Sequence, residues 1–148
     1  MSEHSYRTKA RWTEARRGLA VAEGVAGNIE FASPPEFQGE PGFWTPEHFV
    51  CAAVASCFVT TFRAIADYSK FEYQALEVDV EGVLAKEEGG YRFMEVRVRP
   101  ALTIAREEDR ARGLRLLEKS ERACLVSRSL NSEIKLEPQV FVAAGATK

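Results

Sequence analysis

The run from Phe49 to Val59 carries no charged side chain and has small or apolar residues on nearly every side of a helix. A helix of this kind is buried rather than lying on a surface. Thr45 is the expected N-cap, followed by Pro46 at the first helical position and Glu47 in the first turn. The sequence therefore predicts a long central helix that begins at Pro46 and ends near Tyr68.

Alternating apolar and polar residues predict strands on both sides of this helix. They are Tyr6–Trp12, Leu19–Ala22, Asn28–Phe31, Leu76–Ala85, Tyr91–Ile104 and Ile134–Val142. A second helix is predicted from Glu107 to Arg128, since acidic residues favour its start and basic residues its end. Pro100 predicts an edge or a bulge, and Pro138 interrupts the last strand. This order predicts a single α+β domain over residues 1–148, with a curved, mostly antiparallel sheet.

The predicted central helix needs cover on all of its sides. A single curved sheet of about six short strands covers one side only. We therefore expect a second copy of the chain to cover the other side, giving an intertwined homodimer.

Composition indicates which binding partners and which cellular compartment to expect. The chain has 148 residues and a formal net charge of -2, which gives no electrostatic reason to expect nucleic acid or an anionic membrane as a partner. The apolar run is shorter than the roughly 20 residues of a membrane span, and no secretory signal opens the sequence. We expect a cytoplasmic protein, in which three cysteines are buried, metal-binding or catalytic thiols.

Cys57, within the apolar run, has two interpretations. Free cysteine often acts as a small buried hydrophobe, which is the simpler interpretation. A redox role requires a thiolate, and Cys57 lies too far along its helix for the helix dipole to help. A cation is then needed; Arg63 projects from a different side of the helix, so Arg16 and Arg17 in an earlier turn are the better candidates.

Helix geometry constrains the other candidate residues. Glu47 lies ten residues before Cys57, about 15 Å along the helix, so it could reach that thiol only from an antiparallel copy in a partner subunit. Cys51 points away from Cys57 and is interpreted as a core residue. Cys124, on the apolar face of the second helix, is equally compatible with a core residue and a resolving thiol.

Other kinds of site have little support in the sequence. His4 and His48 have no second ligand at metal spacing, and no Cys-x-x-Cys pair is present. There is no Gly-rich phosphate loop and no Gly-x-Ser-x-Gly motif. We expect no metal and no organic cofactor.

Two segments together resemble the OsmC/Ohr family of osmotically inducible and organic-hydroperoxide-resistance proteins. One runs from Thr45-Pro46-Glu47-His48-Phe49 to Ala52-Ala53-Val54-Ala55-Ser56-Cys57-Phe58, and the other is Glu118-Lys119-Ser120-Glu121-Arg122-Ala123-Cys124-Leu125-Val126-Ser127. The family has a Pro-Glu at the start of its central helix, ten residues from Glu to Cys, and a second Cys in a later helix. Element order and length agree over essentially the whole chain. Leu125 replaces a proline that is common in the family.

The resemblance implies a thiol-dependent peroxidase of the oxidative stress response, acting as an intertwined homodimer. Cys57 resembles the peroxidatic cysteine and Cys124 the resolving one. Glu47 resembles the family's glutamate that holds a catalytic arginine, for which Arg17 or Arg16 is the match, although that arginine could also fall at Leu19. Many members are recycled by external dithiols of the dihydrolipoamide type. The alternative is a non-catalytic dimer that binds an apolar small molecule or a protein partner, with its cysteines in the core.

Overall fold

The computed structural model describes residues 2–144. These residues form two compact units, which divide between Phe49 and Val50. The helix α1, Pro46–Ser69, crosses this division and contributes its first turn to the first unit. The two units are taken in turn below.

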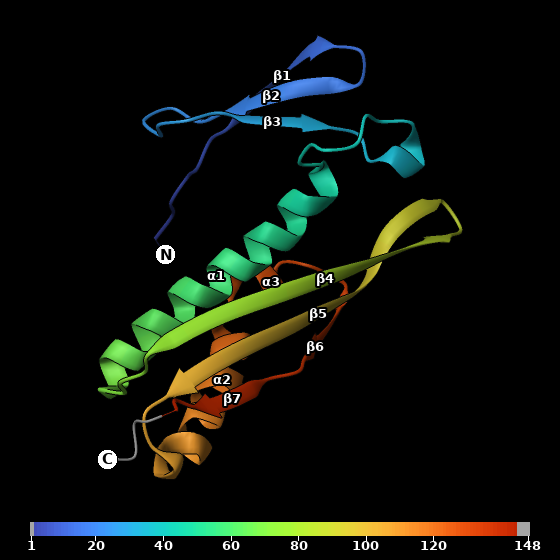
Figure 1. Cartoon of the computed structure of the whole chain (residues 1–148). Coiled ribbons are helices and arrows are strands. Elements are labelled where there is room, and N and C mark those ends of the chain that lie inside the picture. Colours follow the sequence, from blue (N-terminus) through green and yellow to red (C-terminus); the bar gives the residue numbers. More distant parts are fainter. Residues whose placement is uncertain (1, 145–148) are drawn as a thin grey trace. The chain divides into compact units, whose positions relative to one another are not determined.

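The first unit is a small antiparallel sheet followed by an aromatic-rich loop. Its strands are β1 (Lys9–Glu14), β2 (Arg17–Val21) and β3 (Ile29–Ala32), in the order β1-β2-β3 (Figure 1). A short 3-10 turn, η1 (Pro35–Phe37), follows, and an isolated bridge pairs Phe31 with Trp44. All six residues of β1 are exposed, so this sheet buries little apolar surface of its own.

The start of α1 agrees with the sequence prediction. The Thr45 hydroxyl accepts a hydrogen bond from the His48 amide at 3.1 Å, which is the N-cap interaction. In return the Thr45 amide donates to Nδ1 of His48 at 3.0 Å. This exchange is a capping box in which histidine takes the place of the usual Glu or Gln.

The second unit is a mixed sheet covered by helices. A long hairpin joins β4 (Ala75–Glu87) to β5 (Gly90–Ile104), as the sequence predicts. The predicted last strand is two strands, β6 (Glu133–Leu136) and β7 (Gln139–Val142), and both pair with β5 in parallel. The fold class α+β is confirmed, but the strands form two separate sheets rather than one, and the second sheet is partly parallel.

Pro100 explains why the last strand is divided. β5 is a central strand, so Pro100 does not mark a sheet edge; β6 pairs with it up to Val98 and β7 pairs with it from Ala101. Proline has no N–H to donate to a neighbouring strand, and the change of partner falls at this gap. The Glu137 amide then bonds to the Val98 carbonyl at 2.8 Å and bridges the interruption.

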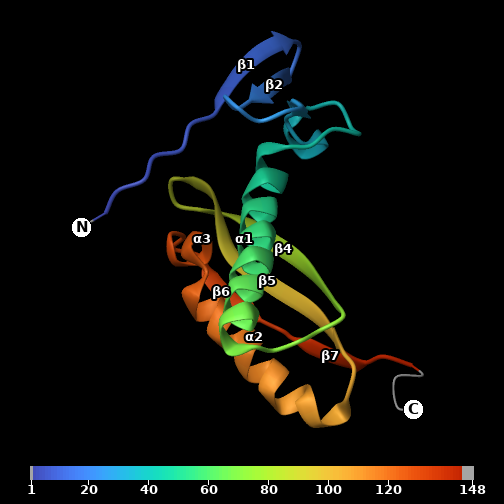
Figure 2. The same cartoon turned by 90° about the vertical axis from the view of Figure 1, so that its left-hand side faces the viewer.

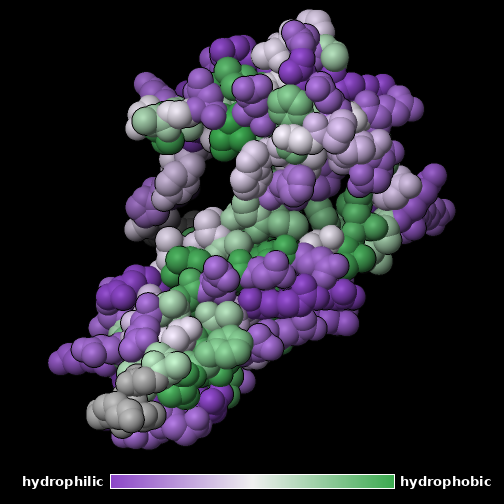
Figure 3. All heavy atoms as spheres, viewed as in Figure 1, coloured by the Kyte–Doolittle hydropathy of each residue, from purple (hydrophilic) through white to green (hydrophobic). Residues whose placement is uncertain are grey.

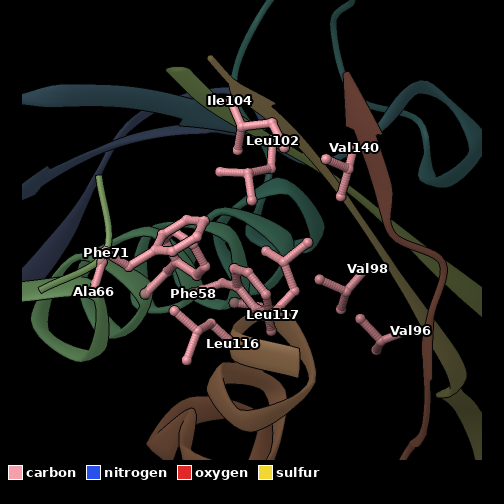
Figure 4. Packing of buried hydrophobic residues seen from close by; sticks show 12 residues of the cluster. Phe58, Ala66, Phe71, Val96, Val98, Leu102, Ile104, Leu116, Leu117 and Val140 are labelled. Carbon is pink, nitrogen blue, oxygen red and sulfur yellow. The ribbon is translucent and has the colours of Figure 1, made fainter. Parts of the chain in front are cut away.

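Both long helices of this unit pack on one face of the sheet. Side chains of β5 that alternate along the strand are fully buried against α1 and against α2, which spans Arg110–Ala123 (Figure 4). Leu117 lies among Phe58 and Val98 in this core (Figure 4). The opposite face of the hairpin carries a network of ion pairs, with Arg99 bound to Asp79, Glu81 and Glu137.

Within the single chain α1 is buried on one side only, as expected for a helix that one sheet covers. Its buried residues, Val54, Phe58, Phe62 and Ala66, recur every four positions and form one stripe that faces the sheet. Hydrophobic side chains elsewhere on the helix reach the surface, as Val59 does, and Figure 3 shows such residues on the exterior. By length and composition alone α1 could also cross a membrane, a test that core helices of soluble proteins pass as well.

The second predicted helix is interrupted at Cys124. A 3-10 turn, η2 (Glu107–Asp109), precedes α2, and α3 (Leu125–Arg128) follows it. Cys124 has φ -65° and ψ 111°, which is an extended conformation between two helices. The short α3 lies beside the middle of α1 (Figures 1 and 2), and this places Cys124 next to the central helix.

Candidate thiol site

Cys57 lies at the middle of α1 and is half-buried. Its sulfur is 3.8 Å from the hydroxyl of Thr61, one helical turn later. Cys124 is completely buried, and its thiol forms a hydrogen-bonded pair with that of Cys57. The structure thus brings together the two thiols that the sequence singled out.

Neutral hydrogen-bond donors surround the Cys57 sulfur. Burial tends to raise the pKa of this thiol, but hydrogen bonds to the sulfur outweigh burial and lower the pKa below its ordinary value. The donors, from larger to smaller effect, are the Val126 amide, the Cys124 thiol, the Thr61 hydroxyl and the Leu125 amide. Within the second unit, amides at the start of α3 and two side chains lower this pKa; the arginines that the sequence analysis named as candidates belong to the first unit.

The Cys124 thiol has the opposite tendency. Burial raises its pKa, and the neighbouring Cys57 raises it further. The hydroxyl of Ser127, 3.4 Å from the Cys124 sulfur, acts against this increase. The backbone of Ser127 acts in the same direction as its hydroxyl. The pair is therefore polarised: Cys57 has the lower pKa and loses its proton first, and Cys124 keeps its proton to higher pH.

Arg17 belongs to the first unit, where it has two carboxylate partners. It forms an ion pair with Glu14 and a second, at 3.5 Å, with Glu40. Its guanidinium carbon lies 5.3 Å from the centre of the Phe43 ring. Its Nε is buried and makes no hydrogen bond among the described residues. Arg16, the other candidate, donates to the side chain of Gln38 at 3.1 Å.

Glu47 is also in the first unit, in the first turn of α1. Its Oε1 is buried without a hydrogen-bond partner in the described part of the chain. Within residues 2–49, Arg17 forms its ion pairs with Glu14 and Glu40 and none with Glu47. A buried carboxylate oxygen without a donor is costly, so Glu47 has capacity for a further partner.

Cys51 is in a different environment from Cys57. It is half-buried beside Gly82 of β4, where an added Cβ would lie 3.1 Å from its sulfur. Burial raises the pKa of this thiol, and the negative charges of Asp79 and Glu81 raise it further, against a hydrogen bond from the Gly82 backbone. Cys51 is therefore a protonated thiol at neutral pH.

Thr61 and Ser127 contact the two thiols, and the sequence reasoning missed both. The available signal was spacing, because Thr61 follows Cys57 by four residues and Ser127 follows Cys124 by three, which places each hydroxyl one helical turn away. No group of three or more potential metal ligands occurs in residues 2–144.

Comparison with known proteins gives both a family and a fold. The family model for OsmC-like proteins matches residues 39–139. A curated relative, the uncharacterized protein YmaD of Bacillus subtilis (strain 168), is 25% identical over 150 aligned residues, which cover 98% of this chain and 99% of the relative.

Several solved structures share the fold. An organic hydroperoxide resistance protein OsmC from Legionella pneumophila superimposes with a TM-score of 0.75 at 22% identity, covering 96% of this chain and 100% of the other. An organic hydroperoxide resistance protein from Elizabethkingia anophelis gives a TM-score of 0.76 at 19% identity, with 96% and 99% covered. An OsmC-like protein from Mycoplasma pneumoniae gives 0.79 at 14% identity, with 95% and 99% covered.

Proposed function

Because the chain belongs to the OsmC-like protein family, we propose that it is a cysteine-based peroxidase that reduces organic hydroperoxides. The observation that carries the proposal is the polarised pair of Cys57 and Cys124. A thiolate is the nucleophile in thiol chemistry, and a neighbouring thiol can convert the oxidised product into a disulfide. The names of the solved relatives from Legionella and Elizabethkingia support the same class of reaction.

The proposed reaction begins at the Cys57 sulfur. The thiolate attacks the distal oxygen of the hydroperoxide, the O–O bond breaks, and the leaving alkoxide takes up a proton to become an alcohol. Cys57 is thereby oxidised to a sulfenic acid. Cys124 then attacks that sulfur, forms a disulfide and releases water. An external dithiol, of the dihydrolipoamide type in this proposal, reduces the disulfide by thiol–disulfide exchange and restores both thiols.

Hydrogen bonds to Cys57 favour the first step. The Val126 and Leu125 amides and the Thr61 hydroxyl donate to the sulfur and favour its charged form. Donors fixed in position by a helix start need no reorganisation when the sulfur reacts. The proposed first step therefore uses the Cys57 thiolate, whose formation these donors favour.

The proposal includes a homodimer and roles for Arg17 and Glu47. Glu47 has a buried oxygen without a hydrogen-bond partner among the described residues, and the buried Nε of Arg17 makes no hydrogen bond there and only a 3.5 Å ion pair with Glu40. A charge-assisted bond between them would orient the guanidinium toward the developing charge on oxygen. Such a bond requires Arg17 to exchange Glu14 or Glu40 for Glu47.

Counting thiols tests this proposal. An organic hydroperoxide such as cumene hydroperoxide is added to reduced protein, and free thiols are counted under denaturing conditions. We expect two of the three thiols to be lost in the wild-type chain and in Cys51→Ser, its matched control. We expect Cys57→Ser to abolish the loss, and Cys124→Ser to stop at a sulfenic acid that dimedone traps.

The alternative function gives a different result. A non-catalytic dimer that binds an apolar small molecule or a protein partner would keep all three thiols. An apolar hollow of about 340 Å³ in the first unit, lined by Gly42, Phe43, Trp44 and His48, is the observation that favours this alternative. Unchanged thiols after exposure to several hydroperoxides would contradict the peroxidase.

A further inference from the structure

Ser127 is a buried serine whose hydroxyl has an unusual partner. Its side chain is 5% exposed, and its hydroxyl donates to the Cys124 sulfur at 3.4 Å. Ser56 on α1 and Ser120 on α2, and Ser129 just after α3, each donate instead to the carbonyl four residues earlier. A serine hydroxyl in a helix often donates to the carbonyl four residues earlier. The acceptor for the Ser127 hydroxyl is the Cys124 sulfur instead.

The break between α2 and α3 makes this contact possible. Cys124 is extended, and it precedes the first residue of α3, so Ser127 is the third residue of that helix. A side chain at the N-cap and one three residues later face each other across the helix start. Here the two are a thiol and a hydroxyl, and the thiol in turn donates to Cys57. Hydrogen bonds in such a chain strengthen one another.

We propose that Ser127 is a positioning residue that holds the Cys124 sulfur in place for its attack on oxidised Cys57. This inference rests on the proposed peroxidase function and concerns its second step only. In that step the Cys124 sulfur loses its proton and forms a bond to the Cys57 sulfur. The S–O bond of the sulfenic acid breaks, and the departing hydroxide takes the proton to leave as water. The Ser127 hydroxyl donates to the attacking sulfur while it carries negative charge.

Few titratable groups act on the Cys124 sulfur. Cys57 faces that sulfur from α1. Of the groups that shift the pKa of Cys124 most, Cys57 is the titratable one. Glu121 and Arg122 precede Cys124 on α2, and Arg128 ends α3. Glu121 is half-buried and both arginines are exposed. Burial raises the pKa of Glu121 itself.

The test measures the two steps separately. Reduced protein is mixed with one equivalent of cumene hydroperoxide and quenched with acid and N-ethylmaleimide, and mass spectrometry follows the sulfenic acid and the disulfide. In Ser127→Ala we expect sulfenic acid to form at close to the wild-type rate. We expect disulfide formation to slow about fivefold, which is the effect of losing one hydrogen bond. The pH midpoint of the second step should rise by about half to one unit.

Control variants distinguish positioning from folding. Ser120→Ala removes a different buried hydroxyl, which lies on α2 and donates to the Leu116 carbonyl. This variant should leave both steps unchanged. Ser127→Thr keeps the hydroxyl and should keep the wild-type pH midpoint. Disulfide formation in Ser127→Ala at the wild-type rate and midpoint would overturn the inference. If the wild-type chain forms neither a sulfenic acid nor a disulfide, the proposed function itself is wrong.

Discussion

Two cysteines on one helix illustrate how local surroundings determine thiol chemistry. Cys51 and Cys57 are six residues apart on α1 and both are half-buried. Burial acts to raise the pKa of both thiols. Carboxylates near Cys51 raise its pKa further, whereas hydrogen-bond donors near Cys57 outweigh the effect of burial. The pKa of the first thiol is raised and that of the second is lowered, so composition and helix position alone do not identify the reactive sulfur.

This difference predicts the order of alkylation in reduced protein. Only the thiolate reacts, so the thiol with the lowered pKa is modified at lower pH. We expect iodoacetamide to modify Cys57 faster than Cys51 at pH 7, and the pH midpoint for Cys57 to lie below that for Cys51. Peptide mass spectrometry across a pH series measures both midpoints.

Thr61→Val provides a control for the cause of this order. It removes one donor at constant shape, so the Cys57 midpoint should rise while the Cys51 midpoint stays in place. A common midpoint for the two thiols in the wild-type chain, or faster modification of Cys51, would contradict the assignment of the thiolate.

At the scale of the elements, the cap at Thr45 fixes where α1 begins. Thr45→Ala removes the acceptor for the His48 amide, and we expect a loss of ~1 kcal/mol in the free energy of unfolding. For a chain of this length that corresponds to a fall of about 2–4 °C in the melting temperature. Thermal unfolding followed by circular dichroism measures the change.

Thr60→Ala is the matched control on the same helix. The Thr60 hydroxyl is exposed and bonds only to carbonyls of the preceding turn, so its loss should change stability by less than about 0.5 kcal/mol. Equal effects of the two substitutions would show that the Thr45 hydroxyl does not act as a cap.

Elements with strong local signals were predictable from the sequence. The central helix follows from Thr45, Pro46 and the apolar run, and the hairpin follows from two alternating runs joined by glycines. The break at Cys124 was not predictable, because Leu125 is a good helix former and no local residue interrupts the pattern. β6 and β7 each pair in parallel with β5, and this pairing depends on tertiary contacts. An alternation of apolar and polar residues predicts a strand but does not show which strand it pairs with or in which direction.

The candidate site was predictable to a similar degree. Cys57 and Cys124 were paired through the resemblance to the OsmC/Ohr family, because an apolar helix alone leaves each of them equally compatible with a core residue. The donors to Cys57 were not, since two of them are backbone amides, which every residue except proline carries. Those amides are free for the sulfur because they open a helix, and that helix start exists only because of the unpredicted break.

At the scale of the whole molecule, the surface of α1 bears on the proposed homodimer. The helix buries a single stripe against its own sheet, and Val59 on another side is 39% exposed. Exposed apolar surface on a helix this hydrophobic is typical of an interface between subunits. We expect light scattering after gel filtration to give about twice the chain mass of 16.5 kDa.

Val59→Glu tests whether this side of α1 forms the subunit interface. A carboxylate buried without a partner is costly, so the variant should dissociate at concentrations where the wild-type chain remains a dimer. Ala111→Glu adds the same charge at an exposed position in the first turn of α2, where a carboxylate is favourable, and should leave the dimer intact. A wild-type chain that elutes as a monomer would contradict the homodimer. A Val59→Glu dimer as stable as that of wild type would instead place the interface on another surface.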